Sequence, residues 1–154
     1  GWSVINASVS GDTSRTGLNR LGPALEVHQP DILIIALGGN DGLRGLPLTE
    51  LENSLSSMIT MAHDKDIRII LAGIRMPPNY GPAYNNSFTS IYTQLSQKYQ
   101  VRLVPRLLDD VADNPQLMQD DGIHPNAEAQ PILLDNAWPI IREALTVAGS
   151  KSGS

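Results

Sequence analysis

The strongest constraint on the fold is an alternation of short, mainly apolar runs with longer segments of helical periodicity. The apolar runs are "DILIIAL" at 31–37, "IRIILAG" at 67–73 and "VRLVP" at 101–105. A continuous apolar run of this kind is typical of a parallel strand that is covered on both faces. A shorter run, "SVINAS" at 3–8, predicts a further strand ahead of the first helix.

Between these runs, apolar side chains recur at helical spacing and so predict amphipathic helices. Strand–helix units repeated in this way predict a right-handed, mostly parallel sheet with helices on both faces. The fold class is therefore α/β. The periodic positions are Leu18, Leu21 and Leu25, then Leu48, Leu51, Leu55, Met58, Ile59 and Ala62, then Phe88, Ile91, Tyr92, Leu95 and Tyr99, and finally Ile132, Leu133, Ile140, Ile141 and Leu145.

Several local features predict how these helices begin, break and bend. Gly22-Pro23 predicts a break in the first helix, because proline lacks the backbone donor that a helix interior needs. Thr49 and Glu52 predict a capping box at the start of the second helix. The last helix is expected to start near Asn126 and to kink at Pro139.

Length and composition limit the kind of protein. The chain has 154 residues, which suits one domain; we expect that domain to span 1–148, followed by a flexible tail at 149–154. A net charge of −5 without clustered Lys or Arg argues against a nucleic-acid partner. The run "ILIIAL" is too short for stable membrane insertion. With no cysteine, thiolate metal sites and a cysteine nucleophile are excluded.

Functional groups of a parallel sheet gather in the loops that leave the carboxyl ends of its strands. The sharpest such loop is "QDDGIHPN", in which Asp121 precedes His124 by three positions. A carboxylate beside an imidazole fixes its tautomer and stabilises the imidazolium, as a general base requires. The alternative is a turn in which Asp121 caps the helix and His124 lies on the surface. His28 and His63 are interpreted as solvated, and no third ligand suggests a metal.

The loop "GGNDGLRG" follows the run at 31–37 and places Asn40 just beyond a buried strand. An amide there can donate to a developing oxyanion. The alternative is a turn in which Asn and Gly supply positive φ angles. Asp41 is interpreted as a local hydrogen-bonding residue. A third loop, "SGDTS", raises the question of whether Thr13 or Ser14 is a nucleophile.

Taken in order, "SVINASVSGDTS", "LGGND" and "DDGIHPN" resemble the SGNH (GDSL-type) hydrolases, and within them the periplasmic thioesterase I/lysophospholipase/arylesterase subgroup. The resemblance implies a three-layer, flavodoxin-like α/β/α sheet with strand order 2-1-3-4-5. It implies that the Gly11 amide and Asn40 form an oxyanion hole, and that Asp121 and His124 are triad acid and base. It also implies a periplasmic or secreted protein that needs no metal or cofactor.

The same resemblance aligns "GDTS" with the family's second block, so that Thr13 and Ser14 are bystanders. The first block, which carries the catalytic serine on the central strand, is absent from the chain. The runs at 3–8 and 31–37 therefore lack their shared neighbour. We expect a complementing N-terminal segment or a swapped copy to fill the gap. The alternative is direct pairing of 3–8 with 31–37.

The function that the resemblance implies is hydrolysis of carboxylic esters or thioesters, such as acyl-CoA, lysophospholipids or aryl esters, by a serine–histidine–aspartate triad. Loops 41–47 and 75–84 are expected to bind the acyl or aryl group. The residues suited to this are Leu43, Leu46, Met76, Pro77 and Tyr80. Two alternatives stay open: an inactive fragment or acyl-binding module without a nucleophile, and a carbohydrate O-acetyl esterase.

Overall fold

A computed structural model describes residues 1–148 of the chain, and the tail expected at 149–154 lies outside the described residues. Its sheet has three parallel strands in the order β1-β2-β3, with Ile32 beside Arg68 and Ile70 beside Arg102. The strands are β1 (Ile32–Ile35), β2 (Arg68–Ala72) and β3 (Arg102–Val104). The three apolar runs at 31–37, 67–73 and 101–105 are thus confirmed as parallel strands.

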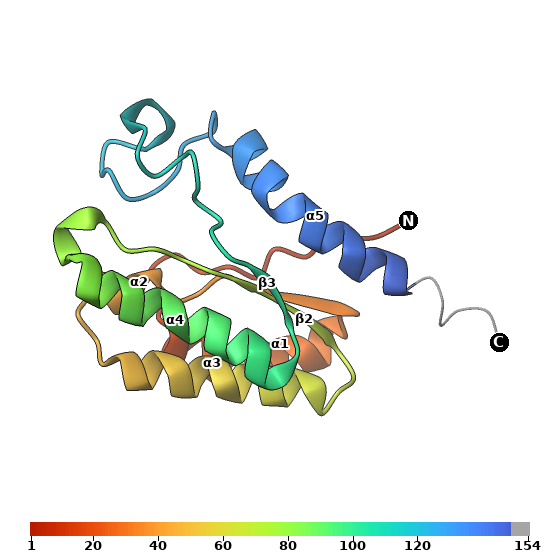
Figure 1. Cartoon of the computed structure of the whole chain (residues 1–154). Helices are drawn as coiled ribbons and strands as arrows, with labels where there is room; N and C mark the ends of the chain where they lie inside the picture. The colour runs from red at the N-terminus through yellow and green to blue at the C-terminus, as the bar shows by residue number, and fades with distance from the viewer. Residues whose placement is uncertain (149–154) are drawn as a thin grey trace.

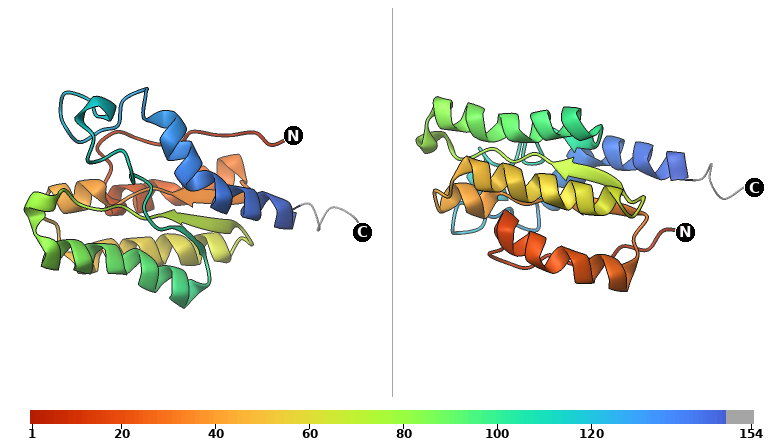
Figure 2. Two further views of the ribbon diagram at one scale, coloured as in Figure 1. Left: turned by 45° about the horizontal axis from the view of Figure 1, so that its top comes forward. Right: turned by 90° about the horizontal axis from the view of Figure 1, so that it is seen from below.

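Helices cover both faces of this sheet, as predicted (Figure 1). One face carries three helices that pack side by side, and the other face carries one (Figure 2). Among residues 1–148, no helix is both long and apolar enough to cross a bilayer. The helices are α1 (Ser14–His28), α3 (Leu48–His63) and α4 (Pro82–Tyr99) on the first face, α5 (Gln130–Ala148) on the second, and the short α2 (Gly39–Leu43) after β1.

Two apolar clusters hold these layers together. Successive side chains of β2 point to opposite faces of the sheet, so Ile69 and Leu71 join the cluster under α1, α3 and α4. Ile70 joins Val104 and Ala144 in the smaller cluster under α5. The α/β fold class is confirmed, and in the larger cluster the residues that the helical periodicity selected pack against strand residues such as Ile69 and Leu71.

The predicted break of the first helix at Pro23 is wrong. α1 runs from Ser14 to His28 with Pro23 inside it. Leu21 and Leu25, on either side of the proline, are both buried against the larger cluster. Packing of these flanking turns on α3 holds the helix together where a backbone donor is missing. α5 likewise continues through Pro139.

The predicted capping box at Thr49 is wrong. α3 already begins at Leu48, and its N-cap, Pro47, has no side-chain hydrogen bond. A capping box is found instead at the start of α1, where Thr13 and Thr16 each accept from the backbone N–H of the other. Asn126 caps a turn ahead of α5 through the N–H groups of Glu128 and Ala129, four residues before the helix proper.

The predicted strand at 3–8 is not formed. Residues 1–9 belong to no strand, and Val4 is 93% exposed. Figure 1 shows this segment running in the same direction as β1, toward the end of the molecule where α2 lies. Direct pairing of 3–8 with β1 is thus also wrong. A strand forms only beside a partner that supplies its hydrogen bonds, and no described segment lies there to do so.

The same gap leaves β1 as an edge strand. Within the described residues it pairs with β2 alone, and Ile34 is 49% exposed on the face opposite the larger cluster. Coverage of both faces, which we expected from the run at 31–37, is therefore wrong for β1. The edge strand presents unpaired backbone groups beside an uncovered apolar side chain.

Candidate functional site

The loop that contains Asp121 and His124 is a tight hairpin ahead of α5. The Gln119 N–H donates to the His124 carbonyl at 2.7 Å, and the Gly122 N–H donates back to the Gln119 carbonyl at 2.8 Å. Gly122 has a φ of 65°, in the left-handed region that glycine adopts without strain. This turn folds the chain back on itself and brings the two functional side chains together.

Asp121 holds the imidazole of His124 in one orientation. Its Oδ2 lies 2.6 Å from His124 Nδ1, while its Oδ1 accepts from the N–H groups of Ile123 at 2.9 Å and His124 at 3.0 Å. With Nδ1–H directed at the carboxylate, Nε2 is the nitrogen left to take up a proton. Asp121 therefore stabilises the turn and orients the imidazole. The alternative role of Asp121 as a helix cap is wrong, because both N–H groups that donate to it belong to the turn itself.

The electrostatics of this pair give a prediction. The hydrogen bonds from His124 and from the backbone lower the pKa of Asp121 to about 2. Because the folded-state pKa lies below the ordinary value of 3.8, the paired carboxylate stays ionised as pH falls through 4 and protonates only near 2. A carbon-13 NMR titration of the Asp121 carboxyl should show this midpoint. A midpoint near the ordinary value would contradict the pairing.

Gly11 and Asn40 form a second pair. The Asp12 N–H donates to the Val9 carbonyl at 3.3 Å and closes a turn in which Gly11 has a φ of 82°. Asn40, in the first turn of α2, donates from Nδ2 to the Asp12 carbonyl at 2.9 Å. One amide hydrogen of Asn40 is thus used to fix the turn, and the other remains for a ligand.

The structure answers the question raised by "GDTS". Ser14 is 0% exposed, and its N–H and Oγ–H both donate to the Asp41 carboxylate, at 2.8 and 2.5 Å. Thr13 caps α1. Neither hydroxyl is available to attack a substrate in this arrangement. Asp41 is the hydrogen-bonding residue we predicted, but its partner is 27 positions away and joins α2 to the start of α1.

All four predicted catalytic residues lie at the carboxyl end of the sheet. Figures 1 and 2 show α2 and the segment 106–128 at the same end of the molecule. The structure brings the residues together as two pairs, Asp121 with His124 and Gly11 with Asn40. Among the described residues, no hydrogen bond links one pair to the other. Convergence of all four on a common point stays a prediction.

The two predicted substrate loops are in contact. The Tyr80 hydroxyl donates to the Leu43 carbonyl at 3.3 Å, and both side chains are partly buried, as are those of Leu46 and Pro77. Met76 differs, because it is 2% exposed and belongs to the larger core cluster. A substrate-binding role for Met76 has no support in this position. Its thioether fills the space left by the missing side chain of Gly42.

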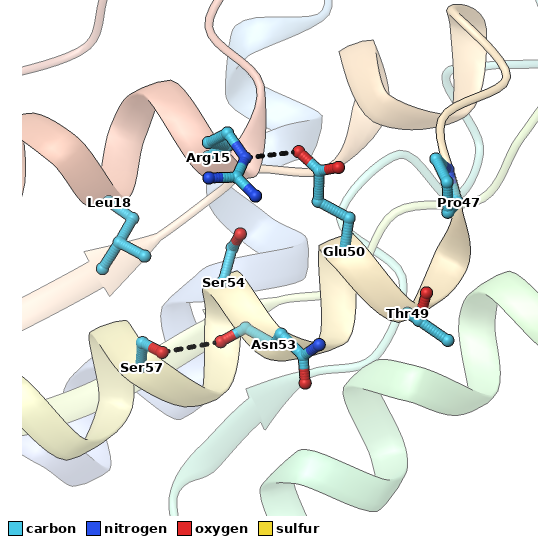
Figure 3. A pocket seen from close by; sticks show the side chains of 8 residues that line it. All are labelled: Arg15, Leu18, Pro47, Thr49, Glu50, Asn53, Ser54 and Ser57. Atoms are coloured by element: carbon cyan, nitrogen blue, oxygen red, sulfur yellow. Dashed lines mark hydrogen bonds and ion pairs between the residues drawn. The ribbon is translucent and has the colours of Figure 1, made fainter.

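One polar surface depression lies away from these residues. It lies between α1 and α3, has a volume of about 300 Å³ and is lined by polar groups such as Asn53, Ser54 and Ser57 (Figure 3). The Arg15–Glu50 ion pair, at 2.7 Å, closes one side. It contains none of the predicted site residues. Within residues 1–148, no group of three or more His, Cys, Asp or Glu side chains is arranged to hold a metal.

Comparison with known proteins fits this geometry. A profile of the GDSL-like lipase/acylhydrolase family matches residues 1–131. The chain is 44% identical over 144 residues to the esterase TesA of Pseudomonas aeruginosa, a match that covers 94% of this chain and 72% of that protein. It is 46% identical over 133 residues to the thioesterase 1/protease 1/lysophospholipase L1 of Escherichia coli K12. The chain belongs to the GDSL-like lipase/acylhydrolase family, a family of ester-cleaving enzymes.

Solved structures agree with the assignment. A crystal structure of TesA superimposes with a TM-score of 0.90 at 44% identity and covers 92% of this chain and 79% of that one. The psychrotrophic esterase EstA from Pseudoalteromonas gives a TM-score of 0.85 at 39% identity, with coverage of 92% and 78%. The match to the Escherichia coli relative covers 86% of this chain but only 64% of the length of that protein. These relatives therefore contain segments that have no counterpart here.

Proposed function

We propose that this chain supplies the acid, the base and the oxyanion hole of a serine esterase. The observation that carries the proposal is the Asp121–His124 pair, held at 2.6 Å at the same end of the sheet as Gly11 and Asn40. Names of relatives at 44% and 46% identity support ester or thioester substrates. The partly buried Leu43 and Tyr80 favour an acyl or aryl group.

Each residue would have a separate task in the reaction. His124 Nε2 takes the proton from a serine hydroxyl as the oxygen attacks the ester carbonyl. The Gly11 N–H and the free amide hydrogen of Asn40 donate to the oxyanion that forms. His124 then gives its proton to the leaving alcohol or thiol. Water repeats the sequence on the acyl-enzyme, and Asp121 stabilises the imidazolium in both steps.

The serine of this mechanism would come from a strand outside the described residues. Ser14 is committed to Asp41, so the nucleophile needs another source. The open edge of β1 has backbone groups with which one extended, mainly apolar strand can pair in parallel, and segment 1–9 itself pairs with no strand. The carboxyl end of such a strand would lie at the end of the sheet where Gly11 and Asn40 are found.

A complementation experiment tests the proposal. The 154-residue chain is mixed with a synthetic apolar strand peptide that ends in Gly-Asp-Ser-Leu, and hydrolysis of p-nitrophenyl butyrate and labelling by a fluorophosphonate are followed. We expect hydrolysis by the mixture (here called the complemented chain), with the label on the peptide serine. A peptide with alanine in place of that serine should bind and stabilise the chain without hydrolysis.

Other outcomes would contradict the proposal. Labelling of the 154-residue chain alone would place the nucleophile within it, and loss of that label in Ser14→Ala would identify Ser14. Binding of the serine peptide without hydrolysis would favour the acyl-binding module. Faster release of acetate from acetylated xylan than of butyrate from its p-nitrophenyl ester would favour the carbohydrate esterase. A periplasmic or extracellular location belongs to the same proposal, and fractionation of expressing cells tests it.

A further inference from the structure

We infer that Arg44 is a positioning residue for the oxyanion hole, because its guanidinium holds the Gly11 carbonyl in the turn. Arg44 Nη2 lies 3.0 Å from the Gly11 carbonyl oxygen. This inference rests on the proposed role of the Gly11 N–H. No sequence pattern points to Arg44, since a single arginine after a glycine-rich turn is not distinctive.

The turn that presents the Gly11 N–H depends on such support. Asp12 closes it by donating to Val9, and Gly11 is its third residue with a φ of 82°. In a type II turn only the third residue has a positive φ. The turn from Val9 to Asp12 fits this type, because Gly11 has a positive φ and Ser10, its second residue, does not. Segment 1–9 is exposed and lies outside the sheet, and the Arg20 guanidinium holds it at the Ala7 carbonyl at 2.6 Å, two residues before the turn.

Contacts from α2 hold two successive carbonyls of the turn. Asn40 Nδ2 donates to the Asp12 carbonyl at 2.9 Å, and Arg44 Nη2 donates to the Gly11 carbonyl at 3.0 Å. The two residues are one helical turn apart, and the Arg44 N–H donates to the Asn40 carbonyl at 3.1 Å. The same pair of contacts thus sets the separation between the Asn40 amide and the Gly11 N–H.

The charge of Arg44 is directed at this carbonyl alone. The nearby Asp12 carboxylate is occupied by Arg20 at 2.6 Å and by the Thr16 hydroxyl at 2.9 Å. Among the described residues, Arg44 forms no ion pair. The guanidinium also covers the Gly11 Cα, where its Nη2 would lie 3.8 Å from an added Cβ. A charged donor of this kind is stronger than a neutral one.

The first test needs no catalysis. In the 154-residue chain, Arg44→Ala should speed amide hydrogen exchange at Asp12, whose N–H closes the turn on Val9, by about tenfold, as expected for the loss of one charge-assisted hydrogen bond. Exchange in α3 and α4 should not change. Arg15→Ala is the matched control, because Arg15 is also an exposed arginine with one acceptor, Glu50. Unchanged exchange at Asp12 in Arg44→Ala would overturn the inference.

The second test concerns the reaction. In the complemented chain, Arg44→Ala should lower kcat by about tenfold and leave KM within about twofold, because a displaced Gly11 N–H weakens binding of the transition state only. Arg44→Lys, which keeps a charged donor, should recover at least half of kcat. A KM increase confined to acyl-CoA substrates would show that Arg44 binds substrate and would overturn a positioning role. Failure of the proposed function would remove hydrolysis but leave the exchange result intact.

Discussion

Replacing His124 with alanine should lower kcat of the complemented chain by at least about four orders of magnitude. The reason is that, in the proposed mechanism, His124 Nε2 takes the proton from the serine hydroxyl and then gives it to the leaving alcohol or thiol. Asp121 holds the ring through Nδ1 at 2.6 Å, which leaves Nε2 as the nitrogen that carries this proton. The measurement is the initial rate of p-nitrophenyl butyrate hydrolysis at saturating substrate.

The chain supplies matched controls for this experiment. His28→Ala and His63→Ala remove the other two histidines, which end α1 and α3, and should leave kcat within about twofold. Asp121→Asn should also lower kcat by about four orders of magnitude, because the imidazole of His124 is no longer held in the required tautomer and orientation. The double variant should be no slower than His124→Ala alone, since the two residues act as one unit. A purely additive double variant, or an active His124→Ala, would contradict the proposed pair.

Gly38→Ala should lower the free energy of unfolding by about 3–5 kcal/mol. Gly38 caps α2 with a φ of 119°, which strains any L-residue. An added Cβ would also lie 2.1 Å from the Tyr92 hydroxyl, which is buried and donates to the Leu37 carbonyl at 2.8 Å. Urea unfolding of the 154-residue chain, followed by circular dichroism, measures the change.

The neighbouring glycine is the control. Gly39 lies in α2 without a positive φ, and its added Cβ would meet only Ile74, at an ordinary contact distance of 3.9 Å. Gly39→Ala should therefore change the free energy of unfolding by less than about 1 kcal/mol. Equal effects of the two substitutions would show that the turn before Asn40 does not depend on the conformation of Gly38.

Sequence patterns predicted the parts of the fold that depend on burial. The runs at 31–37, 67–73 and 101–105 form strands, and β2, between the other two strands, has a buried run from Ile69 to Ala72, as a continuous apolar pattern predicts. Leu55, Ile59 and Phe88 were selected by helical spacing and are buried. The spacing of Asp121 and His124 likewise predicted their contact, since the intervening glycine permits the turn that joins them.

The errors arise where tertiary packing overrides a local preference. Pro23 favours a break, but burial of the turns on either side keeps α1 intact. The run at 3–8 has a strand pattern and no neighbour with which to pair. Met76 has the chemistry of an acyl-binding residue, yet the absence of a side chain at Gly42 lets it enter the core. No local pattern reveals the contact between Arg44 and Gly11, because the two residues are 33 positions apart.

The free edge of β1 has a consequence for solution behaviour. An uncapped parallel strand with an accessible isoleucine is a template on which a second copy can add its own strand, so the purified chain is prone to associate. Opposing this, each copy carries a net charge of −5, and like charges repel at low ionic strength. Association should then grow as salt is added, and a docked strand should suppress it.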